Sequence, residues 1–255
     1  GWTSMFATQS GANAYLGVAF GEYLGAFLPF VSSTHVIASV PLGPWTWQPT
    51  TAQLAGVAII IGLSTLNYFG TRAAASVQGA LTAIKLLAIL ALVGFGLLAT
   101  PNVHPDWTAP LPSVDLLTAA GVAVVAVLGT FDGWYQATFC AGDIERPERN
   151  LPLGMIGGVL LVGVLYLLVN LVYLRALPLS AIGASTRIGE QATTALLGAT
   201  AGQMIAGAVL VSIFGCLASA SLAAARLGLP MAEDAAACRW LSAVHPRYRT
   251  PSAGI

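Results

Sequence analysis

Six long apolar stretches run through this sequence, and they restrict its fold more than any other feature. They cover residues 4–30, 51–71, 77–99, 116–142, 152–174 and 200–225. A hydrocarbon core about 30 Å thick is crossed by about 20 helical residues, so each stretch is long enough to span a bilayer. Transmembrane β-strands are about ten residues long and alternate in polarity, unlike these stretches. The pattern predicts an all-α polytopic membrane protein with six transmembrane helices.

The composition supports the same prediction and excludes other classes of protein. Of the 255 residues, 56% are hydrophobic and 8% are charged, whereas a soluble domain carries about a quarter charged residues. We therefore expect the apolar surface to face lipid in a multi-pass protein of the cell membrane, which in a bacterium is the inner membrane. Ten basic and ten acidic residues cancel, so no basic field is available for nucleic acid. The three cysteines and three histidines lack metal-ligand spacing, and we expect no metal or cofactor.

Both ends of the chain look interrupted. The sequence begins at Gly1, without an initiator methionine. It ends at Ile255, four residues after Pro251, where a new apolar element could be starting. We expect residues 1–255 to form a single transmembrane domain that is truncated at both ends.

The distribution of arginine predicts the orientation in the membrane. The turns after the second, fourth and sixth stretches carry Arg72, Arg146, Arg149, Arg226, Arg239, Arg247 and Arg249. The opposite loops carry only Arg175 and Arg187. The positive-inside rule places the arginine-rich turns in the cytoplasm. The opposite loops also hold Trp45 and Trp47, residues typical of the membrane–water interface.

Small residues in the first stretch predict close helix packing. Gly17, Gly21 and Gly25 recur every four residues, a spacing that lets a second helix approach without lipid in between. A role in shaping a pocket is the alternative.

The fourth stretch combines an acid with residues that disfavour a continuous helix. Asp132 lies between Phe131 and Gly133, with Trp134 next in the chain. An ionisable side chain in the membrane costs about 2.5–3.5 kcal/mol on the mildest scale and marks a candidate functional site. Gly133 favours an interruption, whose freed backbone groups could bind the charged groups of a substrate. The alternative is a packing position with Asp132 hydrogen-bonded inside the bundle.

Two further ionisable residues lie in apolar stretches. Lys85 follows Gly79 by six residues, which is about 9 Å along a helix. Its ammonium could snorkel to the interface, or it could bind helix-end carbonyls as a fixed or titrating cation. Glu22 lies towards the outer end of the first stretch, where a structural or interfacial acid is the favoured interpretation.

A charged turn, residues 141–152, separates the fourth and fifth stretches. Its sequence is AGDIERPERNLP. Proline ends helices and is tolerated in the first turn of a new one. Pro147 is therefore predicted to end one helix, and Pro152 can start the next.

Phe131–Trp134 together with this charged turn resembles the sixth helix and the following turn of amino acid permeases of the amino acid–polyamine–organocation (APC) superfamily. The L-type transporter branch and its bacterial relatives look most similar. Residues 1–2 and 20–25 resemble the third helix of that family, residues 83–88 the fifth, and residues 214–226 and 245–251 the eighth helix and the loop after it.

The resemblance implies a partial LeuT-type inverted-repeat fold, supplying about helices three to eight, and secondary transport of amino acids by alternating access. By resemblance, Phe131, Asp132, Gly133 and Trp134 line the substrate site. Lys85 takes the place that sodium holds in sodium-coupled relatives, which favours sodium-independent exchange or proton symport. The amino acid substrate, the lipid bilayer and a possible proton are the expected partners. The broken first helix of the family is absent from this chain, and Ala218 stands where many relatives have a polar residue.

Other functions remain as alternatives. A channel, or another helical membrane bundle without transport activity, has a similar composition. An enzyme is not expected, because the stretches contain neither paired carboxylates nor a nucleophile–base pair. A preference for cationic amino acids stays open, since Asp132 could pair with a second positive charge.

Overall fold

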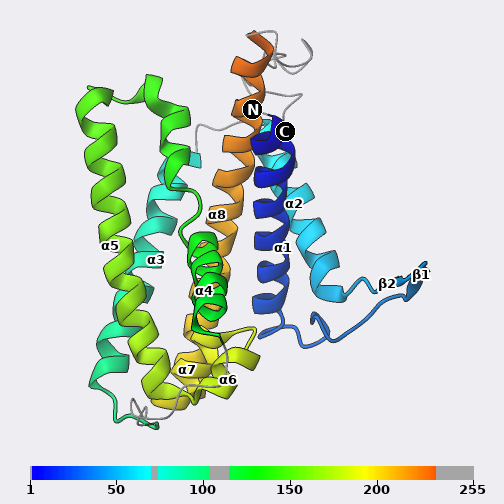
Figure 1. The fold of residues 1–255 in the computed structure, drawn as a ribbon, viewed down its shortest axis with the longest axis vertical. Coiled ribbons are helices and arrows are strands. Elements are labelled where there is room, and N and C mark those ends of the chain that lie inside the picture. Colours follow the sequence, from blue (N-terminus) through cyan, green and yellow to red (C-terminus); the bar gives the residue numbers. More distant parts are fainter. Residues whose placement is uncertain (1, 70–73, 104–114, 234–255) are drawn as a thin grey trace.

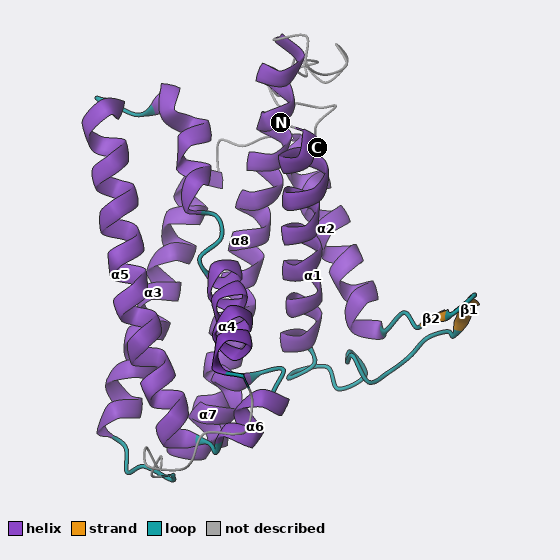
Figure 2. Ribbon diagram, in the orientation of Figure 1, coloured by secondary structure: helices purple, strands orange, loops and turns teal. Residues whose placement is uncertain are grey.

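The computed structural model describes residues 2–69, 74–103 and 115–233, and most of these residues are helical (Figures 1 and 2). The elements in chain order are the π-helix η1 (Thr3–Gln9), α1 (Ser10–Leu24), β1 (Val40–Leu42), β2 (Trp45–Trp47), α2 (Thr51–Phe69), α3 (Ala74–Leu98), α4 (Leu116–Thr130), the 3₁₀ helix η2 (Trp134–Asp143), α5 (Pro147–Ala176), α6 (Leu179–Ala184), α7 (Ile188–Leu197) and α8 (Ala199–Glu233). The predicted all-α membrane fold is confirmed.

Helix lengths differ among the six predicted spans. Within the part of the chain that the structure describes, three helical segments are long and apolar enough to cross a membrane, namely Gly79–Leu98, Pro147–Ala176 and Ala199–Ser221. The apolar segments Thr51–Asn67 and Leu116–Thr130 are shorter. The helix of the fourth stretch is short because it stops at Thr130 in the middle of the stretch. The first stretch likewise leaves the helical path at Gly25, before its predicted end.

α1 and α2 pack together through glycines. A methyl group added to Gly21 would overlap the backbone of Ala52, and one added to Gly56 would lie 2.6 Å from the carbonyl carbon of Gly17. Close helix packing is therefore confirmed for Gly17 and Gly21. Gly25 instead faces the carbonyl of Val31, in the loop after its own helix.

α8 lies at the centre of the bundle and contacts α1, α2, α3 and α7 (Figure 1). Its residues Leu217 and Ala206 are fully buried. α4 differs, because none of its residues is buried, and Leu117 and Val125 are 81% and 70% exposed. A helix so apolar and so exposed matches a surface that lipid or further protein covers.

The carboxylate of Asp115 caps the start of α4. It accepts hydrogen bonds from the backbone N–H groups of Leu117 and Thr118 at 3.4 and 3.2 Å, and from the Thr118 hydroxyl at 2.7 Å. These bonds satisfy two donors that a helix start leaves free. They also hold the pKa of Asp115 below its ordinary value, with the Thr118 side chain as the largest cause.

Arg175 ties together the helix ends opposite the charged turn. Its guanidinium donates to the carbonyls of Leu97 and Ala99, both at 3.1 Å, and so satisfies free acceptors at the end of α3. The backbone carbonyl of Arg175 accepts from Asn102 N–H at 3.1 Å, and the Asn102 side chain donates to Ala195 of α7 at 2.6 Å. Arg175 and Asn102 together thus link α3, α5 and α7.

The predicted roles of the two prolines in the charged turn are wrong. η2 ends at Asp143, α5 begins at Pro147, and Pro152 lies inside α5. Arg146 makes this early start possible, because it adopts the left-handed conformation at φ 48° and its carbonyl accepts from the backbone of Asn150 at 3.0 Å. Proline is favoured at the first position of a helix, and the pattern alone did not show which of the two prolines holds that position.

The loops hold regular structure that the sequence pattern did not reveal. β1 and β2 form an antiparallel hairpin between α1 and α2, with Gly43 at φ 68° in its turn. The short helices α6 and α7 occupy the connection between α5 and α8 (Figure 1). Each of these elements is too short to produce a clear hydrophobic period.

Candidate functional site

The predicted interruption of the fourth span is confirmed at residues 131–133. α4 ends at Thr130, and Gly133 adopts φ 96° and ψ −11° before η2 begins at Trp134. L-residues rarely tolerate this left-handed conformation, so glycine is the natural residue here. η2 then runs for 10 residues, whereas 3₁₀ runs longer than about four residues are uncommon and often mark a hinge. The chain therefore crosses this span as two helical pieces.

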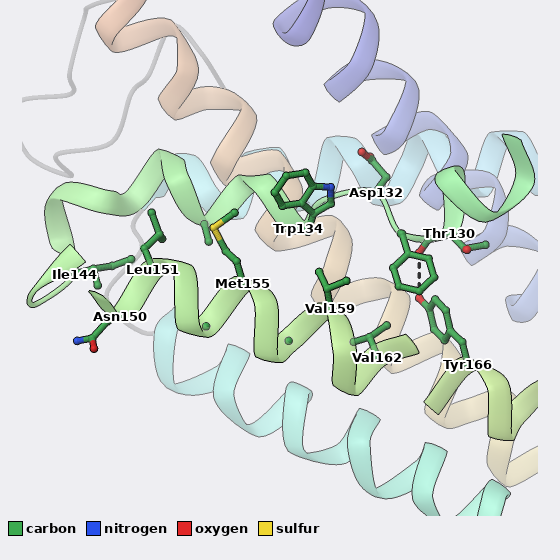
Figure 3. A pocket seen from close by; sticks show the side chains of 14 residues that line it. Thr130, Asp132, Trp134, Ile144, Asn150, Leu151, Met155, Val159, Val162 and Tyr166 are labelled. Carbon is green, nitrogen blue, oxygen red and sulfur yellow. Dashed lines mark hydrogen bonds between the residues drawn. The ribbon is translucent and has the colours of Figure 1, made fainter. Parts of the chain in front are cut away.

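A cavity of about 420 Å³ lies between the interrupted helix and α5 (Figure 3). Its lining comprises Thr130, Phe131, Asp132, Trp134, Ala137, Ile144, Asn150, Leu151, Gly154, Met155, Gly158, Val159, Val162 and Tyr166. Three predicted site residues, Phe131, Asp132 and Trp134, belong to this lining. Gly133 is absent from it and contributes the backbone turn. The volume is in the range of small-molecule pockets, about 300–1,000 Å³.

Tyr166 of α5 fixes the end of α4. Its hydroxyl donates a hydrogen bond to the carbonyl of Thr130 at 3.1 Å, shown as the dashed line in Figure 3. That carbonyl is one of the acceptors that the helix end leaves free. The Tyr166 and Phe131 rings meet edge to face, with centroids 5.2 Å apart and planes at 73°. Tyr166 therefore holds the interruption in a defined geometry.

Sequence reasoning missed the contribution of α5 to this site. The available signal was a tyrosine within an otherwise apolar span, together with Gly154 and Gly158 four residues apart. Neither glycine has an atom near its missing side chain, which leaves space on the face that lines the cavity.

The cavity combines an apolar floor with polar groups at its rim. Met155, Val159 and Val162 of α5 form the floor. The carboxylate of Asp132 is exposed and points away from α5 in Figure 3, and the Tyr135 side chain hydrogen-bonds to it. The indole of Trp134 lies next to Met155 and is 54% exposed. The floor of this cavity suits the apolar part of a small ligand.

Lys85 lies outside the cavity lining and reaches a different helix. Its ammonium donates to the sulfur of Cys216 on α8 at 3.0 Å, and its side chain is half-buried. Lys85 therefore does not share the cavity with Asp132, and its side chain connects α3 to α8.

Comparison with known proteins identifies relatives along the whole chain. A family model described as amino acid permease matches residues 1–255. The serine/threonine exchanger SteT of Bacillus subtilis is 30% identical over 94% of this chain and 58% of its own length. The human b(0,+)-type amino acid transporter 1 is 32% identical over 68% of this chain and 33% of its own length. An uncharacterized transporter of Mycobacterium tuberculosis is 24% identical over 96% of this chain and 56% of its own length. The chain thus spans 58% of SteT and a smaller share of the other two.

Proposed function

Because this chain belongs to the amino acid permease family, we propose that the protein transports amino acids across the membrane by alternating access. The interruption at residues 131–133, with a cavity of about 420 Å³ beside it, carries this proposal. A carrier needs a small-molecule site part-way across the membrane, and interrupted helices supply one because their free backbone groups bind charged substrate groups. In this proposal Phe131, Asp132, Gly133 and Trp134 form the part of the substrate site that this chain contributes.

Sodium-independent exchange or proton symport is the proposed mode of transport. Lys85 supports it, because a fixed ammonium between α3 and α8 supplies positive charge without a bound metal ion. The relative from Bacillus subtilis is named as a serine/threonine exchanger, which favours exchange of small amino acids. The apolar floor formed by Met155, Val159 and Val162 suits the aliphatic part of such a substrate.

A channel is the alternative that composition leaves open. A selectivity filter needs rings of carbonyls or charges around a pore, whereas the lining of this cavity has a single carboxylate, Asp132, and an apolar floor. Counterflow separates the two functions. Vesicles preloaded with unlabelled serine should take up labelled serine faster than empty vesicles if the protein is an exchanger. A proton gradient should accelerate uptake if it is a proton symporter. Uptake that neither preloading nor a proton gradient accelerates would contradict the proposed transport.

The first prediction tests the interruption itself. We expect Gly133→Ala to lower amino acid uptake by about tenfold. The left-handed conformation costs an alanine about 1–2 kcal/mol, and alanine favours a continuous helix. The measurement is uptake of labelled amino acid by vesicles containing the full-length protein, at equal protein content.

Gly129→Ala is the matched control. Gly129 lies in α4 four residues earlier, and no atom lies within 4 Å of the position of an added methyl group. Uptake by this variant should remain close to wild type. If Gly133→Ala transported as well as Gly129→Ala, the interruption would have no role in transport.

A further inference from the structure

The hairpin between α1 and α2 has one apolar face. Val40 pairs with Trp47 across the strands, and Trp45 lies two residues before Trp47 on the same strand. Directly paired residues, and residues two apart on a strand, point to the same side of a sheet. Val40, Trp45 and Trp47 therefore share one face, which we call the tryptophan face.

The opposite face of the hairpin is polar. Thr46 lies between the two tryptophans and pairs with Pro41, so both point to the other side. Beyond this pair, the side chain of Gln48 donates a hydrogen bond to the hydroxyl of Ser39 at 3.4 Å. The hairpin is thus amphipathic across its two faces.

The tryptophan face is not covered by the described part of this chain. Trp45 and Trp47 are 77% and 57% exposed. In Figure 1 the hairpin projects sideways from the start of α2, away from the other helices. It lies at the end of α1 and α2 that the positive-inside rule places on the outer side of the membrane.

The surroundings of the hairpin indicate what covers this face. No Asp, Glu, Lys or Arg occurs between Glu22 and Arg72, so the hairpin offers no charged residue to a protein partner. The exposed residues of α2 that follow it, Leu54, Val57 and Ile61, are apolar and 53–61% exposed. The hairpin is therefore followed in the chain by a helix with exposed apolar residues suited to lipid, and tryptophan concentrates where acyl chains meet headgroups.

We propose that the hairpin lies flat in the outer membrane–water interface, with its tryptophan face against the acyl chains and its Thr46 face towards the headgroups. The hairpin would then anchor the outer ends of α1 and α2 at a fixed depth. The occupant of this surface is the phospholipid bilayer itself.

Depth-dependent fluorescence quenching tests the proposal. The full-length protein is reconstituted in phosphatidylcholine vesicles whose lipids are brominated either near the headgroup or near the chain end. The emission of Trp45 and Trp47 is taken as the difference between wild type and the Trp45→Phe, Trp47→Phe double variant. We expect lipids brominated near the headgroup to lower this emission by about twofold or more, as for interfacial tryptophan. Lipids brominated near the chain end, and aqueous iodide, should lower it less.

A tryptophan moved to the other face is the matched control. Thr46→Trp in the double variant places one indole on the polar face of the same hairpin, and iodide should quench it more strongly than brominated lipid does. Circular dichroism shows whether the double variant keeps its helices. If it does not, the single variants Trp45→Phe and Trp47→Phe provide the difference signal.

Three results would overturn the proposal. Stronger quenching of the native pair by iodide than by any brominated lipid would place the tryptophan face in water. Protection from both quenchers would show that protein covers the face, either a second copy or another subunit. Equal quenching of Thr46→Trp and the native pair by brominated lipid would remove the difference between the two faces.

Discussion

Lys85 is the only lysine in the chain, and its ammonium is held at 3.0 Å from the sulfur of Cys216. Placing an ammonium within an apolar span is costly, so its presence there indicates a function. Here the ammonium of Lys85 joins two helices, α3 and α8. α3 and α8 also pack against each other, so the charge of Lys85 lies at a contact between two helices of the bundle.

We therefore expect Lys85→Ala to lower uptake by about tenfold, because the variant lacks the only fixed cation on this span. Membrane insertion should be unchanged, since alanine favours both helix and lipid. Uptake by vesicles as a function of external pH checks this, and the amount of protein in the membrane fraction checks insertion.

Cys216→Ala is the control for Lys85, because it removes the sulfur contact and keeps the ammonium. If transport depends on the charge, this variant should keep more activity than Lys85→Ala. Wild-type uptake with unchanged pH dependence in Lys85→Ala would exclude a role for the lysine.

At the scale of helices, the contact between α1 and α2 depends on the absence of side chains. The backbones of Gly21 and Ala52 approach so closely that a methyl group does not fit between them. We expect Gly21→Val to destabilise the protein by about 1–3 kcal/mol, the usual cost of inserting atoms into a packed contact. The melting temperature in detergent should fall accordingly.

Gly11→Val provides the comparison for this prediction. Gly11 lies in the same helix, is exposed, and has no atom within 4 Å of an added methyl group. The substitution has the same effect on helix propensity in both variants, so the difference in melting temperature isolates the contact. Equal melting temperatures would mean that α1 and α2 do not pack as described.

The whole molecule has an asymmetric distribution of positive charge. Arg146 and Arg149 lie at the start of α5, and Arg175 lies in its last turn, about 40 Å away along a helix of this length. At that far end Arg175 binds helix-end carbonyls, and Arg187 pairs with Glu190 at 3.1 Å. Bonds to neutral carbonyls leave the charge of Arg175 in place, so the asymmetry rests on the uneven number of arginines in the sequence on the two sides.

This asymmetry predicts that the charged turn is cytoplasmic and that the α6–α7 connection is outside. In a variant without the native cysteines, Ala184→Cys should react with an impermeant maleimide on intact cells. Glu148→Cys should react only after the cells are permeabilised. The reverse labelling pattern would mean that the protein is inserted with the opposite orientation.

Sequence reasoning anticipated the features that depend on residue type along the chain. Apolar length predicted the helices, and the unusual combination of Asp132 and Gly133 predicted the interruption. Close packing at Gly17 and Gly21 followed from their spacing. These predictions succeeded because lipid forces the backbone to satisfy its own hydrogen bonds, so that composition nearly determines secondary structure.

Only the tertiary structure decided which distant residues meet. The hydrogen bond from Tyr166 to Thr130, the contact of Lys85 with Cys216, and the links from Arg175 to α3 each join segments that are far apart in sequence. Local pattern carries no information on such pairs, because helix crossing and rotation set them. The same holds for the hairpin. Its composition did not show that residues 45–47 form a strand, and it is the strand that places Trp45 and Trp47 on one face. The sequence thus determined that the chain is a membrane bundle with one interrupted helix, and packing determined that α5 completes the cavity beside that interruption.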